Sequence, residues 1–348
     1  MKKINVITSG ICILCCPYLQ ANEINIYGLG HLSADNIDDG LTSNIYVTSN
    51  SSRLGFNGEF TLDDNVKVIF QYESGIDFTG QGGNDGNGGA ESSGQLFTKT
   101  RPSYIGFQGE FGKALIGHMP FLDQWVNDYN LFADQVGDLG NLWEASGIPG
   151  RSDNVIHYKS PIYSGMSITA SYVPEEGVKD ADYYLLKGNY TNDKLKLGLA
   201  YTNIGKTGLS NNEQTGYALT IGYYDDAYSL GGGFQQESKV NGIRNNDRTS
   251  VSLGASLTMG KKGKLKLQVA NSTSDLEQSD ATQFAIGYDY KLAQHTIIYI
   301  AYAFMDNDRN VKFSVNGKGH GDKVVPVLGD DPSALSIGVI YHFDYKVL

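Results

Sequence analysis

The chain has 348 residues, with 27 Lys and Arg against 38 Asp and Glu, and it is rich in glycine (43) and tyrosine (23). This acidic balance excludes a surface built to bind nucleic acid, which relies on clustered basic side chains. Outside the N-terminus no apolar run approaches the roughly 20 residues that a membrane-spanning helix needs. Helical membrane proteins are therefore excluded as well.

The first expected element is an export signal over residues 1–21. It begins with two lysines, continues with an apolar run and ends on the small residue Ala21. This order is typical of a secretory signal peptide. All three cysteines lie inside this segment, so no thiolate metal site is expected in the mature chain, residues 22–348. Its removal leaves 25 basic against 38 acidic residues, a net charge of −13.

Several later segments alternate between apolar and polar residues. Examples are VKVIFQYE (66–73), KLKLGLAY (194–201) and KLKLQVA (264–270), with Ile69 as an exception in the first. A period of two predicts strands with one apolar and one polar face. Alternation alone leaves open whether the apolar face meets a second sheet or lipid.

Short turns and long polar stretches alternate along the whole chain. Seven short turns lie near residues 63, 112, 163, 192, 225, 261 and 292, and eight long stretches cover 34–43, 78–97, 119–150, 174–182, 203–215, 235–247, 272–281 and 305–333. Tight turns at one end and long loops at the other are typical of outer-membrane barrels, whose aromatic girdles also suit the tyrosine content. The sequence therefore predicts an all-β fold, a transmembrane antiparallel β-barrel of about 16 strands.

The longest irregular stretch in the first half is 119–150. It carries the acids Asp123, Asp128, Asp134, Asp138 and Glu144 and lies between two alternating segments. A connection of this length counts against the strands around it unless the loop is itself functional. We expect an acidic loop that folds into the barrel and narrows the channel.

Six segments together resemble the Gram-negative general porins. They are INIYG (24–28), SRLGFNGEF (52–60), TRPSYIGFQGEFG (100–112), LFADQVGDLGN (131–141), RSDNVIHYKSPIYSG (151–165) and GVIYHF (338–343). The resemblance implies a homotrimer of sixteen-stranded barrels in outer-membrane lipid, with the third outer loop folded inward. It also implies passive diffusion of ions and small hydrophilic solutes, with no cofactor and no enzymatic activity.

The resemblance further implies a constriction in which loop acids face basic side chains on the opposite wall. The matching positions are Arg53, Arg101, Lys159 and Arg151 on the basic side, and Asp134, Asp138 and Glu144 on the loop. Opposed charges in a narrow channel impose a transverse field that favours small polar solutes. The alternative for each residue is a solvated charge on the channel wall.

Two histidines stand where the family commonly carries permanent positive charge, His118 and His157. Because the reference pKa of histidine is about 6.5, the constriction would be less basic at neutral pH. Together with the net charge, this predicts a mild cation preference that weakens at high salt. We hypothesise that permeability changes between about pH 5 and 7 through these histidines, the alternative being that they only line a wet wall.

Three other functions are alternatives, and the sequence departs from the family pattern at two places. A sugar-selective channel could use Trp125 and Trp143, and an adhesin or receptor would use the outer loops. A hydrolase finds no support in H-E-x-x-H or G-x-S-x-G spacing. Pro102 falls within the strand expected to hold Arg101, and DYKVL (344–348) follows the phenylalanine on which the family normally ends.

Overall fold

The computed structural model describes residues 23–63, 65–79, 101–120, 129–143, 146, 148, 150–206, 212–317, 319–321 and 323–347. The expected signal segment 1–21 lies outside these residues. None of the helices in the described part of the chain is long and apolar enough to cross a membrane.

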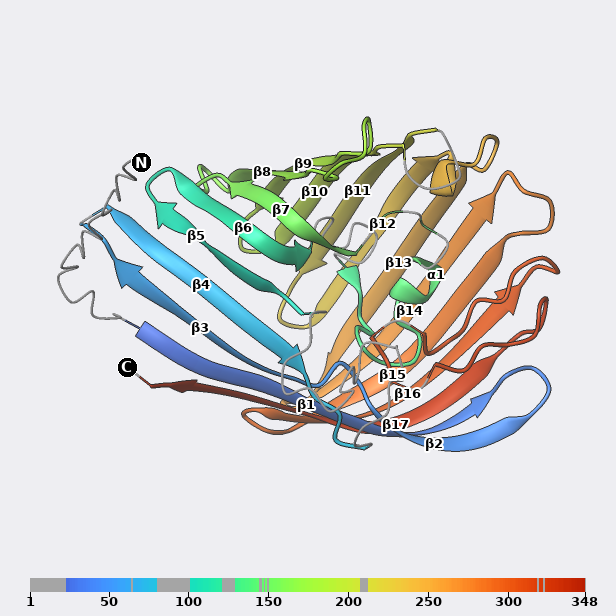
Figure 1. Cartoon of the computed structure of the whole chain (residues 1–348). Coiled ribbons are helices and arrows are strands. Elements are labelled where there is room, and N and C mark those ends of the chain that lie inside the picture. Colours follow the sequence, from blue (N-terminus) through green and yellow to red (C-terminus); the bar gives the residue numbers. More distant parts are fainter. Residues whose placement is uncertain are drawn as a thin grey trace, which may run out of the picture.

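The described chain forms one antiparallel sheet that closes on itself (Figure 1). Its strands are β1 (Glu23–Asp38), β2 (Ser43–Ser49), β3 (Arg53–Thr61), β4 (Val66–Gly75), β5 (Ser103–Gly109), β6 (Gly112–Pro120), β7 (Arg151–Lys159), β8 (Met166–Val173), β9 (Tyr183–Thr191), β10 (Leu195–Ile204), β11 (Gln214–Tyr224), β12 (Tyr228–Ser238), β13 (Arg248–Met259), β14 (Gly263–Ser274), β15 (Ala281–Ala293), β16 (Thr296–Asn307) and β17 (Ser333–Lys346). Two short helical turns are α1 (Gly140–Trp143) and η2 (Val240–Gly242). Closure comes from the pairing of β1 with β17.

The predicted count of about 16 strands is confirmed. Both β2 and β3 pair with β1, so they are two parts of one barrel strand that bends at residues 50–52, where Ser51 has a φ of 50°. Every other strand pairs with its neighbours in the chain. The barrel therefore has sixteen strands, although seventeen segments are distinguished.

The outer face of the barrel is apolar, which settles the alternative between lipid and a second sheet. On β10 the side chain of Leu199 is 64% exposed while its neighbours Gly198 and Ala200 are buried. Leu253 and Ile337 repeat the pattern on β13 and β17 with exposures of 64% and 59%. An apolar surface that continues around a closed sheet faces lipid rather than water.

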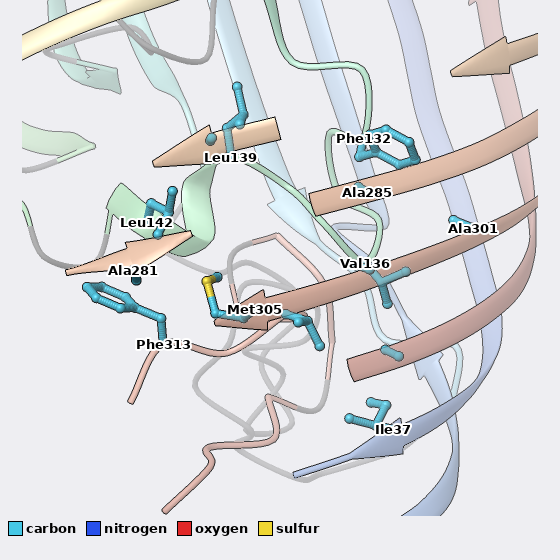
Figure 2. Close-up of a cluster of buried hydrophobic side chains, with 14 of the residues drawn as sticks. Ile37, Phe132, Val136, Leu139, Leu142, Ala281, Ala285, Ala301, Met305 and Phe313 are labelled. Carbon is cyan, nitrogen blue, oxygen red and sulfur yellow. The ribbon is translucent and has the colours of Figure 1, made fainter. Parts of the chain in front are cut away.

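The middle of the predicted constriction loop, residues 129–143, lies inside the barrel (Figure 1). Phe132, Val136 and Leu139 are fully buried in a cluster formed with side chains of the β14–β17 and β1 wall (Figure 2). That wall carries small residues such as Ala285 and Ala303, which leave room for the loop. Each large apolar side chain removed from water in this way stabilises the docked loop by roughly 1.5–3 kcal/mol.

A second segment, which the sequence predicts only as an outer loop, also folds inward. In the connection between β16 and β17, Phe313 and Val315 are buried in the same cluster as Phe132. The amide of Gly137 donates to the carbonyl of Val315 at 2.8 Å, which joins the two inward segments. The interior is therefore narrowed by two loops that support each other.

Neither Pro102 nor the tail after Phe343, the two departures from the family pattern, disrupts the barrel. Pro102 precedes β5, and its carbonyl still accepts a hydrogen bond from the Glu73 amide at 3.0 Å. A proline at a strand boundary removes no ladder donor. The C-terminal tail extends β17, since Lys346 pairs with Asn25 of β1 and its Nζ lies 3.1 Å from Glu23 Oε2.

Candidate functional site

The inward loop meets the barrel wall at Arg53, on the strand next to β1. This residue begins β3 directly after the bend at 50–52, which places its side chain partway along the wall rather than at a rim. Its Nη1 lies 3.9 Å from Asp134 Oδ2 of the loop. The structure thus brings a predicted base and a predicted acid into contact across the interior.

Arg101 joins the same group through Glu73 of β4, a carboxylate that is not among the site residues predicted from the sequence. Glu73 Oε2 lies 4.0 Å from Arg53 Nε, and its Oε1 lies 3.7 Å from Arg101 Nη1. Tyr27 on β1 donates to Glu73 Oε2 at 2.9 Å. Glu73 therefore holds two guanidinium groups together and fixes how they face the loop. The sequence indicates only that Glu73 lies on the polar face of VKVIFQYE (66–73), which faces the channel.

Arg101 keeps its charge although it is buried. Arg101 is 6% exposed, and its burial together with the positive charges of Arg53 and Arg151 lowers the pKa of Arg101 to about 10. The side chain is therefore still protonated at neutral pH. Two guanidinium groups face two carboxylates, Glu73 and Asp134, and Arg151 adds a further positive charge near Arg101.

Asp138 has a different role from Asp134. It is 6% exposed, and its carboxylate accepts hydrogen bonds from Asn130 Nδ2, the Asp134 amide and the Gly140 amide, each at 2.7 Å. Burial and the charge of Asp134 raise the pKa of Asp138 to about 7, against these hydrogen bonds, which lower it. Asp138 shapes the loop that presents Asp134. Glu144 lies outside the described residues.

The other two predicted bases occupy opposite ends of β7. Arg151 is the first residue of this nine-residue strand and Lys159 is the last. At about 3.4 Å per residue, they stand roughly 27 Å apart along the strand. The structure places Arg151 near Arg101, whose pKa its charge lowers, and does not bring Lys159 to this group. Lys159 lies beside the short turn that follows β7.

The two histidines have separate surroundings. His118 Nδ1 lies 2.7 Å from Asp153 Oδ1, whose side chain is 83% exposed. His157 Nδ1 lies 2.9 Å from the hydroxyl of the buried Ser171 on β8. His118 is therefore placed to form an ion pair when protonated, while His157 rests against the inner wall.

The loop is also anchored to the wall behind it by polar contacts that the sequence does not predict. Gln283 Nε2 donates to the carbonyl of Gly137 at 2.7 Å. Lys266 Nζ lies 2.8 Å from Asp289 Oδ1 and 3.0 Å from Gln135 Oε1. Since buried carbonyls and charges need partners, these contacts fix one position of the loop.

A buried polar network anchors the second inward segment. His320 Nε2 lies 3.2 Å from Asp35 Oδ2, and both side chains are fully buried. The hydroxyl of Ser51 donates to the carbonyl of Gly319 at 2.7 Å, at the bend that precedes Arg53. This network connects the last long loop to the part of the wall that carries the arginine.

Comparison with known proteins gives a consistent picture. A family model described as "Gram-negative porin" matches residues 11–310. The chain is 28% identical over 316 residues to outer membrane porin protein 32 of Delftia acidovorans, covering 85% of each chain. It is 26% identical over 324 residues to a chitoporin of Vibrio furnissii, covering 81% of this chain and 85% of that protein. The solved anion-selective porin from Comamonas acidovorans superimposes with a TM-score of 0.77 at 24% identity, covering 92% of this chain and 99% of that one.

Proposed function

Because the chain belongs to the Gram-negative porin family and is an outer-membrane channel, we propose that Arg53, Arg101 and Asp134 form the constriction of that channel. Ions and small hydrophilic solutes diffuse through it passively. The observation that carries this proposal is the approach of Arg53 Nη1 to Asp134 Oδ2 at 3.9 Å, from the wall and the inward loop respectively. Glu73 positions the two arginines, and Arg151 adds positive charge beside them.

The constriction favours solutes with a dipole. Its positive charges belong to the wall and Asp134 belongs to the loop, so a solute that passes beside this ion pair experiences the field of its separated charges. A polar solute can align with this field, whereas an apolar solute must displace water held by the charges. Size and polarity are therefore the main criteria for passage.

Charge selectivity at this point is weak, because two carboxylates offset two of the three guanidinium groups. The outer loops are acidic, with exposed carboxylates at Glu175, Glu176, Asp275 and Glu277. We expect these charges to concentrate cations at the outer mouth and to give a mild cation preference at low salt. The preference should fade at 1 M salt, where the Debye length is about 3 Å. The solved Comamonas porin is described as anion-selective, so the sign of the selectivity is a direct test.

The experiment is a planar-bilayer recording of the full mature protein with the substitution Asp134→Asn. Neutralising this acid should lower the cation-to-anion permeability ratio by roughly twofold, because the loop side of the constriction loses its charge. Asp193→Asn is the matched control, since it removes the same charge from the exposed turn between β9 and β10. Equal ratios in the wild-type protein and Asp134→Asn would refute the constriction assignment.

We also propose that the functional unit is a homotrimer in outer-membrane lipid. The support is family membership, together with the trimer form described for the solved OmpT of Vibrio cholerae. Conductance steps in groups of three from a single insertion event are the expected result. Single independent steps from a homogeneous preparation would contradict it.

A sugar-selective channel is a second candidate, favoured by one feature of the interior. A cavity of about 120 Å³ is lined by aromatic and polar side chains that include Tyr129, Tyr224, Asn189 and Thr220. Aromatic faces beside hydroxyl and amide groups suit sugar rings, and one relative is named a chitoporin. Block of the ion current by a chitin oligosaccharide, lost in Tyr129→Ala, would favour this candidate. Trp125 lies outside the described residues.

A further inference from the structure

Three lysines lie in one row across neighbouring strands. Lys113 of β6 pairs directly with Lys159 of β7, Lys159 pairs with Thr169 of β8, and Thr169 pairs with Lys187 of β9. We call Lys113, Lys159 and Lys187 the lysine row. Residues directly opposite each other in an antiparallel pair point to the same face of the sheet, so the whole row shares one face.

That face is the interior of the barrel. On β9 the neighbour Leu186 is 54% exposed on the outer surface, whereas Leu185, two positions from Lys187, is buried in an inner cluster. On β6 the residue two positions from Lys113, Leu115, belongs to the same cluster. Thr169, between the lysines, is 9% exposed. The row therefore lines the channel rather than the lipid surface.

The spacing of the row leaves positive charge concentrated. Directly opposite residues have Cβ atoms about 5 Å apart, and Lys187 lies two strands beyond Lys159, or roughly 10 Å at about 4.8 Å per strand. Like charges placed directly opposite each other destabilise a sheet. Neither Lys113 nor Lys159 forms an ion pair with an acid of the described residues.

A fourth lysine, Lys67, aligns with the lysine row but has an acidic partner. Lys67 of β4 pairs with Gln108 of β5, which pairs with Lys113, so it continues the row by two strands. Its ammonium forms an ion pair with Glu59. An acid thus balances the lysine at one end of the row, while Lys113 and Lys159 keep their charge for the channel.

The row is separate from the constriction. Lys159 lies about 27 Å along β7 from Arg151, toward the short turns, which face the periplasm in this family. A solute that has passed the constriction from outside, or that approaches from the periplasm, meets the row in the inner half of the channel.

We propose that the lysine row binds multivalent oxyanions, such as phosphate and dicarboxylates, in the inner half of the channel. The inference rests on the proposed channel function. Two lysines whose Cβ atoms are about 5 Å apart can turn their ammonium groups toward different oxygens of one oxyanion, and each such charge-assisted hydrogen bond is stronger than a neutral one. Thr169 lies between Lys159 and Lys187 in the row, and a threonine hydroxyl is a further hydrogen-bond donor. Chloride carries one charge on one atom, so two ammonium groups attract it less strongly than a multivalent oxyanion.

The test uses inorganic phosphate as the probe on the full mature protein in a planar bilayer. At constant ionic strength, phosphate should reduce the chloride current of the wild-type channel in a concentration-dependent manner. It should act at lower concentration from one side of the membrane, because the row lies nearer one end. In Lys113→Gln/Lys159→Gln/Lys187→Gln the half-maximal concentration should rise by about tenfold, since the bridging charges are gone.

Two variants keep the test decisive. Lys312→Gln removes an exposed lysine of the β16–β17 loop and should behave as the wild-type protein. Lys113→Gln alone should shift the half-maximal concentration by about threefold, which covers the case that the triple variant does not fold. A conducting wild-type channel without phosphate inhibition, or equal inhibition of wild type and row variants, would overturn the lysine row while leaving the porin function intact. A folded barrel without any conductance would instead overturn the channel function.

Discussion

The loop that narrows the channel should come loose when its central aromatic anchor is removed. Phe132 is fully buried against the β14–β16 wall, and Lys266 Nζ lies 4.5 Å from the centre of its ring. Replacing a buried phenylalanine by alanine costs about 3–5 kcal/mol. Water in the lumen can fill the space, so we take the lower end, about 3 kcal/mol. At about 1.4 kcal/mol per tenfold change, Phe132→Ala lowers the ratio of docked to undocked loop by roughly 100-fold.

Single-channel recording is the appropriate assay, because the strand ladders of the barrel are untouched and overall folding should persist. We expect Phe132→Ala to increase current noise and to lower the voltage at which the channel closes. Phe284→Ala on β15 is the matched control, since this ring is 41% exposed on the outer face. Gly287→Ala offers an independent perturbation, because its new Cβ would lie 2.8 Å from Phe132 Cε1 and displace the ring. Unchanged noise and closing voltage in Phe132→Ala would refute the docking argument.

Three further predictions concern charge. Glu73→Gln leaves two guanidinium groups facing Asp134 alone, so the cation-to-anion permeability ratio measured from reversal potentials should fall; an unchanged ratio would contradict the assigned role of Glu73. The pKa of Asp138, raised to about 7, means that the docked loop is most stable at low pH and loses stability as pH rises from about 4 to 7. Current noise of the wild-type channel should therefore increase as pH rises over this range, and the noise of Asp138→Asn should not depend on pH there. The histidine hypothesis predicts a permeability change between about pH 5 and 7 that disappears in His118→Ala/His157→Ala but persists in Asp138→Asn.

The barrel could be predicted from the sequence because its rules are local. Alternation fixes which face of each strand is apolar, and turn length fixes which end each connection occupies. Even the exception at Ile69 is consistent, since this residue packs on an inner cluster. The position of Lys159 in the channel was harder to predict. The resemblance places Lys159 in a motif but does not say that it lies at the far end of β7 from Arg151.

The missing parts of the site depend on contacts between distant segments. Glu73 contacts both arginines because β4 lies between β3, which begins at Arg53, and β5, which Arg101 precedes. The second inward loop looked like any polar connection, since the buried pair of His320 and Asp35 joins residues far apart in sequence. Alternation carries no information about such contacts, and neither does loop composition.

The two inward loops divide the inner wall of the barrel into a part that they cover and a part that solutes contact. They cover the β14–β17 and β1 wall, where alanines and glycines serve as a docking surface. Solutes must then pass along the remaining wall, which begins beside β1 with Arg53 on β3 and Arg101 before β5, and which carries the lysine row on β6, β7 and β9. Most acidic charge lies in the outer loops and the base-rich wall lies inside, so a net charge of −13 does not exclude the passage of anions. Selectivity in such a channel depends on the order in which a solute meets these charges and on how strongly salt screens each of them.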